Sequence, residues 1–282
     1  MFFRILRFDI KYGVLRRFWI YILVFVFFLV ANFILYMHHV NMSVSNPALA
    51  NDSFTLGDMI IHIVGGSKRF VTSDATNFSY PILWMISIFI VLFINLRYPI
   101  DELFDYGRHI MILSGNRRLW WVSKCCWLLL SVALYYLILA LSITMFGGIV
   151  KADCSFYVSE FLLQLLMIDY REVLYQPWDL ITPLLVHIFS IFTLCMVQML
   201  LSLYIKPVIS FFAVAATTIL SVFFSSPFLV NSYAMVLRTD KITVIEPLST
   251  KLGFALCIIM CLMAFIIGTI RINKLDVLSK ED

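Results

Sequence analysis

Two short stretches of this chain carry residue types that could bind a metal ion or a phosphate group. His38 and His39 could ligate a metal, but an adjacent pair beside a long apolar run is more often incidental, and no further ligand has the spacing of a zinc site. Gly65-Gly66-Ser67-Lys68 has the composition of a phosphate loop but lacks its full glycine-to-lysine spacing. We therefore expect no catalytic residues, metal ligands or cofactor site in this chain, and we expect that it is not an enzyme.

Six long uncharged runs are the dominant feature of the sequence. The chain is 62% hydrophobic and 13% charged, with a mean hydropathy of +0.96, which is far from the composition of soluble domains. A helix of about 20 apolar residues crosses the roughly 30 Å hydrocarbon core of a bilayer. We therefore expect one all-α membrane domain over residues 1–282 with six transmembrane helices. Their expected ranges are 18–37, 80–96, 122–147, 182–205, 207–224 and 252–271.

Basic residues are divided unequally between the two sets of connections, and this predicts the orientation. Residues 1–17, 97–124, 206 and 271–282 hold 14 of the 21 Lys and Arg residues. Because basic residues near span ends remain in the cytoplasm, we expect both termini to be cytoplasmic. Acidic residues run the other way, seven inside and ten outside. The net charge of +4 is thus a difference between two faces, and we expect no nucleic-acid partner.

Two segments are expected to lie along the membrane surface. Residues 1–17 place three basic residues at helical spacing among apolar ones, which predicts an interfacial helix that contacts membrane lipid and turns at Gly13 into the first span. A plain basic flank that only sets topology is the alternative. Residues 161–168 are apolar but too few to cross a bilayer. We expect them to form an interfacial helix on the outer surface, or alternatively a hydrophobic contact with substrate.

The fifth apolar run, residues 207–237, is longer than one straight transmembrane helix needs. Pro227 interrupts this run, and a helix usually ends at or before the residue that precedes a proline. We expect the span to end near Phe224 and residues 228–237 to form a separate half-helix, giving a re-entrant outer hairpin between spans five and six. One long, steeply tilted helix is the alternative.

The six uncharged runs contain no ionisable acid, lysine or arginine in their interior. Carriers driven by protons or sodium ions usually place such groups inside the bundle, so their absence argues against a secondary transporter with its own ion coupling. The most polar groups that remain are His187 and Gln198. Such side chains often hydrogen-bond between helices, so we interpret both as packing groups first, with Gln198 also a candidate for a substrate pathway.

The connection after the second span carries the most specific motif. It contains Asp105-Tyr106-Gly107-Arg108 and, further on, Ser114-Gly115-Asn116-Arg117-Arg118-Leu119-Trp120-Trp121-Val122-Ser123-Lys124. An acidic residue and glycine, a short apolar helix, and then small, basic and aromatic residues before a lysine are similar to the same connection in type-2 ATP-binding-cassette exporter permeases. The N-terminal interfacial helix, the six spans and the interrupted outer hairpin also resemble the layout of that family.

This resemblance implies a half-transporter that takes its energy from a separate cytoplasmic ATPase subunit, which binds ATP and Mg²⁺. The permease would work as a homodimer or together with a related permease. The segment between spans two and three would carry the coupling helix, whose mix of apolar and charged residues fits an interface with an apolar centre and a charged rim. The residues assigned to ATPase coupling are Asp101, Glu102, Phe104, Asp105, Gly107 and Arg108.

The expected cargo is an amphipathic peptide, such as a bacteriocin or toxin, because phenylalanine is abundant (26 of 282 residues) and no charged group lines the spans. A lipid, an antibiotic or a polysaccharide stays open. The resemblance implies that the second and fifth spans line the route. Small residues in the fifth span are followed by Phe223 and Phe224, which could seal an outer gate or simply face lipid.

Two other classes of protein also fit the sequence. A non-transporting membrane scaffold or sensor subunit would need no substrate route, and co-purification with an ATPase would distinguish it from an exporter. A small glycosylated eukaryotic carrier is suggested only by the sequons at Asn41, Asn51 and Asn77, which a loop rich in Asn and Ser also produces by chance. A mobility shift after glycosidase treatment would support that carrier. We favour an exporter subunit in a bacterial cell membrane.

The expected orientation can be tested by labelling introduced cysteines with an impermeant maleimide. We expect Arg117 and Arg118 to be cytoplasmic, and Lys68, Asp169 and Lys241 to be outside. In a Cys154→Ser background, which removes the native cysteine of the expected outer segment, an Arg117→Cys variant should stay unlabelled in intact cells, whereas a Lys241→Cys variant should be labelled. Labelling at position 117 from outside intact cells would contradict this orientation.

Overall fold

The computed structural model describes residues 2–46, 52–71, 78–104 and 117–274. Over these residues the chain is all-helical and contains no β-strand. Five helical segments are long and apolar enough to cross a membrane. They are Phe2–Ser45, Ile82–Leu103, Arg117–Val150, Ile181–Leu201 and Thr250–Lys274.

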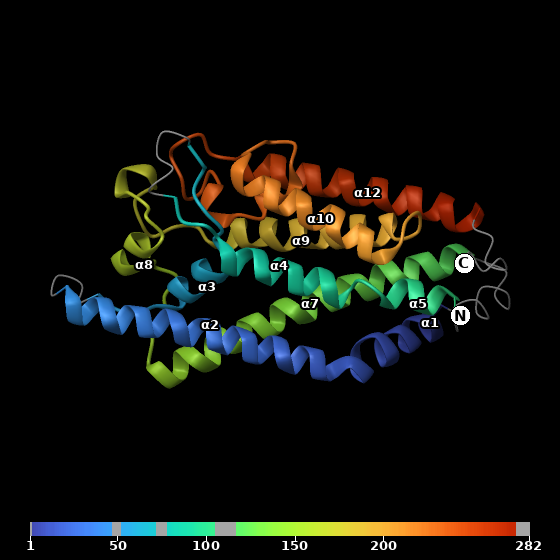
Figure 1. The fold of residues 1–282 in the computed structure, drawn as a ribbon, viewed down its shortest axis with the longest axis horizontal. Helices are drawn as coiled ribbons and strands as arrows, with labels where there is room; N and C mark the ends of the chain where they lie inside the picture. The colour runs from blue at the N-terminus through green and yellow to red at the C-terminus, as the bar shows by residue number, and fades with distance from the viewer. Residues whose placement is uncertain (1, 47–51, 72–77, 105–116, 275–282) are drawn as a thin grey trace.

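The long helices run along the longest axis of the molecule and define its two ends (Figure 1). Helix α9 (Ile181–Leu201) lies in the middle and packs against α4 (Ile82–Ile94), α7 (Arg117–Val150), α10 (Pro207–Phe223) and α12 (Thr250–Lys274). Helix α2 (Phe18–Ser45) packs along α7. The bundle is therefore organised around α9 and α7.

The two ends of the bundle differ in what they contain. The end that we call the terminus end holds α1 (Phe2–Asp9), α5 (Tyr98–Phe104), the start of α7 and the end of α12 (Figure 1). The opposite end, the loop end, holds α3 (Leu56–Val64) and α8 (Glu160–Leu165). The first and last described residues, Phe2 and Lys274, thus lie at the same end.

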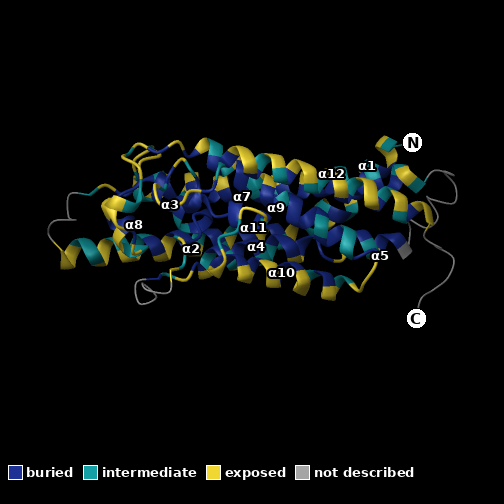
Figure 2. Ribbon diagram, turned by 90° about the horizontal axis from the view of Figure 1, so that it is seen from above, coloured by how far each residue is buried: buried dark blue, intermediate teal, exposed yellow. Residues whose placement is uncertain are grey.

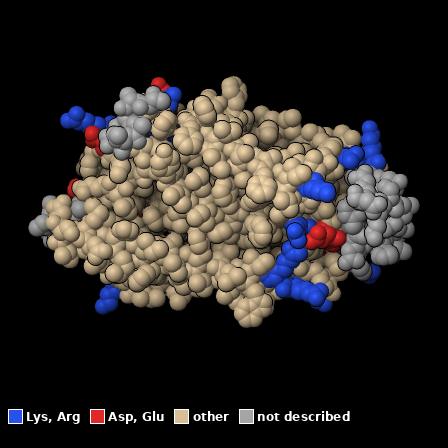
Figure 3. Space-filling view, viewed as in Figure 1, with Lys and Arg blue, Asp and Glu red and all other residues tan. Residues whose placement is uncertain are grey.

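The surface between the two ends is apolar. Figure 2 shows buried residues inside the bundle and exposed residues along the outward faces of the long helices. Many of these exposed residues are large and hydrophobic, among them Leu23, Phe212 and Ile259. Figure 3 shows Lys, Arg, Asp and Glu near both ends and a broad band without them in between. An apolar exterior of this kind suits hydrocarbon rather than water, so the fold is compatible with a multi-pass membrane protein.

The fifth apolar run is broken where the proline predicts. Helix α10 ends at Phe223, which confirms the expected end near Phe224. The half-helix expected over 228–237 is wrong, because that segment contains only α11 (Val230–Tyr233) and a 3-10 turn, η6 (Val236–Arg238). Side chains from other helices hydrogen-bond its backbone: the Ala234 carbonyl accepts from Trp84 Nε1 and lies 2.5 Å from His187 Nδ1. The segment therefore needs no continuous helix to satisfy its polar groups.

The apolar stretch 161–168 does not lie on the surface as expected. Its helical part, α8, buries Phe161 and the two leucines that follow. The reason is a set of hydrogen bonds that draw its N-terminus inward: Ser159 N donates to Asp58 Oδ1 at 2.8 Å, and Phe161 N donates to Asp52 Oδ2 at 3.0 Å. Asp58 also accepts from Thr55 N in the capping box of α3. Burial raises the pKa of Asp58 to about 6, against the opposing effect of these hydrogen bonds.

Arg238 joins the irregular segment to the end of α10. Its guanidinium is buried and donates to the carbonyls of Ser221 at 2.6 Å and Val222 at 2.7 Å. It also donates to the Ser67 carbonyl at 3.0 Å. The last carbonyls of a helix lack partners within the helix and attract positive charge. Burial, with Arg69 nearby, lowers the pKa of Arg238 to about 10, which still leaves it charged at neutral pH.

Replacing this arginine should destabilise the loop end. An Arg238→Met variant leaves at least three buried carbonyls without donors, so we expect a loss of about 2–4 kcal/mol in unfolding free energy. The measurement is the thermal unfolding midpoint of the purified protein in detergent. Arg69→Met is the matched control, because Arg69 pairs with Glu246 while remaining 43% exposed and should cost far less. Equal midpoints for the two variants would show that Arg238 does not hold this end together.

Candidate functional site

Three buried charged side chains meet at the terminus end of the bundle. Lys124 Nζ forms ion pairs with Asp9 Oδ1 and, at 2.7 Å, with Glu102 Oε2. The side chains of Asp9 and Lys124 are 0% exposed and that of Glu102 is 5% exposed. We call these three residues the charge cluster. Each comes from a different element: α1, α7 and α5.

Neighbouring polar side chains add hydrogen bonds to the cluster, although the buried Glu102 Oε1 has no partner among the described residues. Tyr98 Oη donates to Asp9 Oδ1 at 2.9 Å, and Ser123 Oγ donates to Asp9 Oδ2 at 2.6 Å. Trp120 Nε1 donates to Glu102 Oε2 at 2.6 Å. Buried ions are tolerated only where such partners offset the loss of water. The cluster therefore fixes α1 and α5 to the start of α7 in one arrangement.

A glycine lets α1 come close enough to make these contacts. Gly13 lies in η1 (Ile10–Val14), a single π-helical turn between α1 and the 3-10 turn η2 (Leu15–Arg17). A Cβ atom at Gly13 would lie 2.4 Å from Trp127 Nε1 and 2.8 Å from Tyr98 Cε1. Only a residue without a side chain fits there. The expected turn at Gly13 is thus present, and the glycine permits the close packing of this turn against Trp127 and Tyr98.

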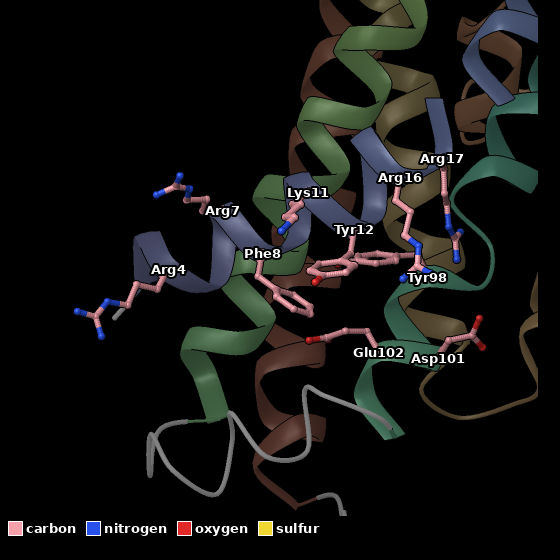
Figure 4. A pocket seen from close by; sticks show the side chains of 10 residues that line it. All are labelled: Arg4, Arg7, Phe8, Lys11, Tyr12, Arg16, Arg17, Tyr98, Asp101 and Glu102. Atoms are coloured by element: carbon pink, nitrogen blue, oxygen red, sulfur yellow. The ribbon is translucent and has the colours of Figure 1, made fainter. Parts of the chain in front are cut away.

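Next to the charge cluster lies a basic cavity of about 1000 Å³ between α1 and α5. Figure 4 shows Lys11, Arg16 and Arg17 directed toward the rings of Tyr12 and Tyr98. Arg4 and Arg7 also line the cavity, but extend away from α1. The other lining residues are Phe8, Asp101 and Glu102.

The residues assigned to ATPase coupling are placed only in part. Asp101 is exposed and borders the basic cavity, whereas Glu102 is buried on Lys124 and does not belong to the exposed charged rim that was expected. Phe104 is the last residue of α5. Asp105, Gly107 and Arg108 lie outside the described residues, so their assignment stays a prediction.

Sequence reasoning gave Asp9 no role and used Lys124 only as the lysine that ends the motif before the third span. The uncharged runs do lack such charges, but sequence reasoning did not predict that charges just outside them, at the terminus end, are buried together. Two signals were available. Asp9 is the only acid in residues 1–17 and follows the buried Ile5 by one helical turn, and Lys124 directly precedes a long uncharged run.

At the loop end, the candidate gate residues line a different hollow. Phe223 packs against Phe70 with ring centroids 5.6 Å apart and against Tyr80 at 6.3 Å. Phe223 and Phe224 border a cavity of about 600 Å³ that also contains Lys68. Phe224 is 63% exposed. Phe223 is thus partly held by aromatic rings of its own chain, and a gate between two copies stays a prediction.

The two most polar side chains of the bundle both make hydrogen bonds within it. Gln198 is buried on α9, and its Nε2 donates to the Leu92 carbonyl on α4 at 3.0 Å. His187 lies on the same helix, and its Nε2 is 2.8 Å from Tyr136 Oη. Both side chains therefore pack helices together, as interpreted from the sequence. A pathway role for Gln198 stays a prediction.

Over the described residues, these features define the class of the protein as an all-helical fold that is compatible with a multi-pass membrane protein and has a buried ionic contact at one end. The sequence model of one protein family matches residues 59–278, which is most of the chain. That family is described as "Protein of unknown function (DUF2705)", and the chain belongs to it. No curated protein and no solved structure matches the chain.

Removing the cation of the charge cluster should strongly destabilise the folded protein, whereas removing all three charges should destabilise it much less. Lys124→Met leaves two buried carboxylates unpaired, for which we expect a loss of about 3–5 kcal/mol in stability. The triple variant Asp9→Asn, Glu102→Gln, Lys124→Met should recover most of the stability that Lys124→Met loses.

The readout is the thermal unfolding midpoint in detergent, with the exposed Lys274→Met as the control. If the unfolding midpoint of the triple variant is no higher than that of Lys124→Met alone, charge pairing is not what holds the cluster.

Proposed function

We propose that this protein is the transmembrane subunit of an ATP-driven exporter, which forms the substrate pathway and couples to a separate ATP-binding-cassette ATPase. ATP and Mg²⁺ would bind to that ATPase and not to this chain. Two copies, or one copy and a related permease, would assemble around the pathway. The support comes from the resemblance of the sequence layout and from the geometry of the terminus end.

The charge cluster is the observation that carries the proposal. An exporter must transmit the movement of its ATPase to the helices that line the pathway. Helix α5 begins the connection that would carry the coupling helix, and Glu102 of α5 is ion-paired to Lys124 of α7. Asp9 adds α1 to the same contact. A displacement of α5 would therefore move α1 and α7 with it, because rigid packed elements transmit strain as a unit.

Six crossings and cytoplasmic termini belong to the proposal. Helix α10 has 17 residues, so it spans about 26 Å at 1.5 Å per residue. This is slightly less than the roughly 30 Å of an average hydrocarbon core, a mismatch that local thinning of the bilayer accommodates at modest cost. Counting α10 as the fifth crossing returns the chain to the end where it began, which agrees with Phe2 and Lys274 lying together (Figure 1). The 14 basic residues then face the cytoplasm.

The proposed cargo is an amphipathic peptide, such as a bacteriocin or toxin. The apolar surface of the helices and the absence of charge from the middle of the described bundle fit an apolar route better than one for small ions. The charge cluster does not suggest a proton path of its own, because its carboxylates are held by Lys124 and three further donors. A scaffold or sensor subunit and a glycosylated carrier remain the alternatives, and no contact described above favours either.

The decisive experiment isolates the full-length, tagged protein from its native membrane in mild detergent. An ATP-binding-cassette ATPase should co-purify, and the complex should hydrolyse ATP. The variant Phe104→Asp places a charge in the proposed coupling helix. It should reduce ATPase retention by about tenfold or more, as loss of a central interface residue does.

Lys206→Asp is the matched control, since it adds an acidic residue to the connection between α9 and α10 and should leave retention unchanged. The proposal fails if intact wild-type protein retains no ATPase, or if Phe104→Asp retains as much as the control.

A further inference from the structure

The basic cavity has an excess of positive charge that no ion pair among the described residues neutralises. Its wall contains Arg4, Arg7, Lys11, Arg16 and Arg17. None of these five residues forms an ion pair with another described residue. Of the two carboxylates in the wall, Glu102 is ion-paired to Lys124, and Asp101 forms no ion pair with a described residue. Such a concentration of unpaired cations attracts an anion.

The irregular backbone between α1 and α2 is what brings three of these cations together. In a continuous helix Lys11, Arg16 and Arg17 would point in different directions. The π turn η1 and the 3-10 turn η2 instead direct all three toward the Tyr12 and Tyr98 rings (Figure 4).

Aromatic rings hold the three cations in position. Lys11 Nζ lies 5.4 Å and Arg16 Cζ 5.9 Å from the centroid of the Tyr12 ring, and Arg17 Cζ lies 5.4 Å from that of Tyr98. These distances are typical of cation–π contacts, and such contacts order the three side chains before any ligand binds. The Tyr98 hydroxyl is already bonded to Asp9, so the ring cannot turn away without breaking the charge cluster.

The surroundings of the cavity identify the anion as part of a lipid. Leu15, Phe18 and Trp19, next to Arg16 and Arg17 in sequence, are exposed to 62%, 46% and 66%. Exposed tryptophan beside basic residues is typical of the boundary between headgroups and hydrocarbon. From there α2 continues with exposed Ile22, Leu23 and Val26, an apolar track along which acyl chains can lie.

We propose that the cavity between α1 and α5 binds the phosphate-bearing headgroup of an anionic phospholipid in the leaflet at the terminus end. Lys11, Arg16 and Arg17 donate to the phosphate oxygens, and Arg4 and Arg7 attract the headgroup from the rim. Guanidinium groups suit this role because their donors match two phosphate oxygens at once. The site requires only that the chain be inserted in a membrane, so this proposal does not depend on the proposal of ATP-driven export.

The test measures lipid binding to the purified full-length protein in neutral detergent. Phosphatidylglycerol and phosphatidylcholine of equal chain length are titrated and the bound lipid is counted by native mass spectrometry. We expect wild-type protein to bind phosphatidylglycerol about tenfold more tightly than phosphatidylcholine. The Arg16→Gln, Arg17→Gln variant should lose this preference, since each basic residue near an anionic headgroup contributes to binding.

The matched control removes two positive charges from the same end but outside the cavity. Lys206 and Lys274 are both exposed, and the variant Lys206→Gln, Lys274→Gln should keep the preference. Thermal unfolding in phosphatidylcholine alone verifies that both double variants are folded. If Arg16→Gln, Arg17→Gln does not fold, Lys11→Gln alone should weaken phosphatidylglycerol binding, while Arg16→Lys, Arg17→Lys should retain most of it.

Three outcomes would overturn the proposal. Wild-type protein would bind the two lipids equally, or the control would lose the preference as fully as the cavity variant. In the third, millimolar inorganic phosphate without lipid would raise the unfolding midpoint of wild-type protein as much as phosphatidylglycerol does. That result would assign the cavity to a soluble phosphate compound instead of a membrane lipid.

Discussion

The ion pairs of Lys124 with Asp9 and Glu102 are the interaction on which the terminus end depends. Moving one such ion out of water costs several kcal/mol, so the cluster persists only because both carboxylates face the same ammonium group and receive three further hydrogen bonds. These requirements are geometric. They position α1 and α5 on α7, and they also hold Tyr98, whose ring forms part of the basic cavity. The cavity is therefore a consequence of the cluster.

Among the described residues of the loop end, a buried charge is stabilised by neutral groups and not by opposite charges. There a buried cation, Arg238, faces neutral carbonyls at the end of α10. This contact supplies donors to the Ser221 and Val222 carbonyls where the chain leaves α10 at Phe223 and continues as irregular backbone. Between the two ends, neutral contacts such as that of Gln198 with the Leu92 carbonyl join the helices. Among the described residues, charge is thus buried only where the apolar band stops, an arrangement that would keep the costly groups away from the centre of a bilayer.

The proposed exporter subunit and the proposed lipid site make different use of this arrangement. Coupling to an ATPase would need α5 to move as one body with α7, which the charge cluster enforces. Binding of an anionic headgroup would instead stabilise α1 against α5 by neutralising the cations between them. Both depend on the same few residues around Tyr98, although neither requires the other. A membrane in which such lipids are abundant would favour the packed arrangement of the terminus end.

The amino-acid sequence by itself determined that this chain forms long apolar helices compatible with a membrane, because long apolar runs can satisfy their backbone in hydrocarbon only as helices. It also determined where α10 ends, since Pro227 acts locally. It could not determine that Asp9, Glu102 and Lys124 meet, because Lys124 lies 115 positions from Asp9 in the chain and is brought to it only by the packing of α7 on α1. For the same reason the sequence predicted a surface helix over residues 161–168. In the structure, hydrogen bonds to Asp58 and Asp52 hold the N-terminus of α8 inward. Charge and hydropathy are properties of single residues, whereas the pairing of buried charges is decided by tertiary structure.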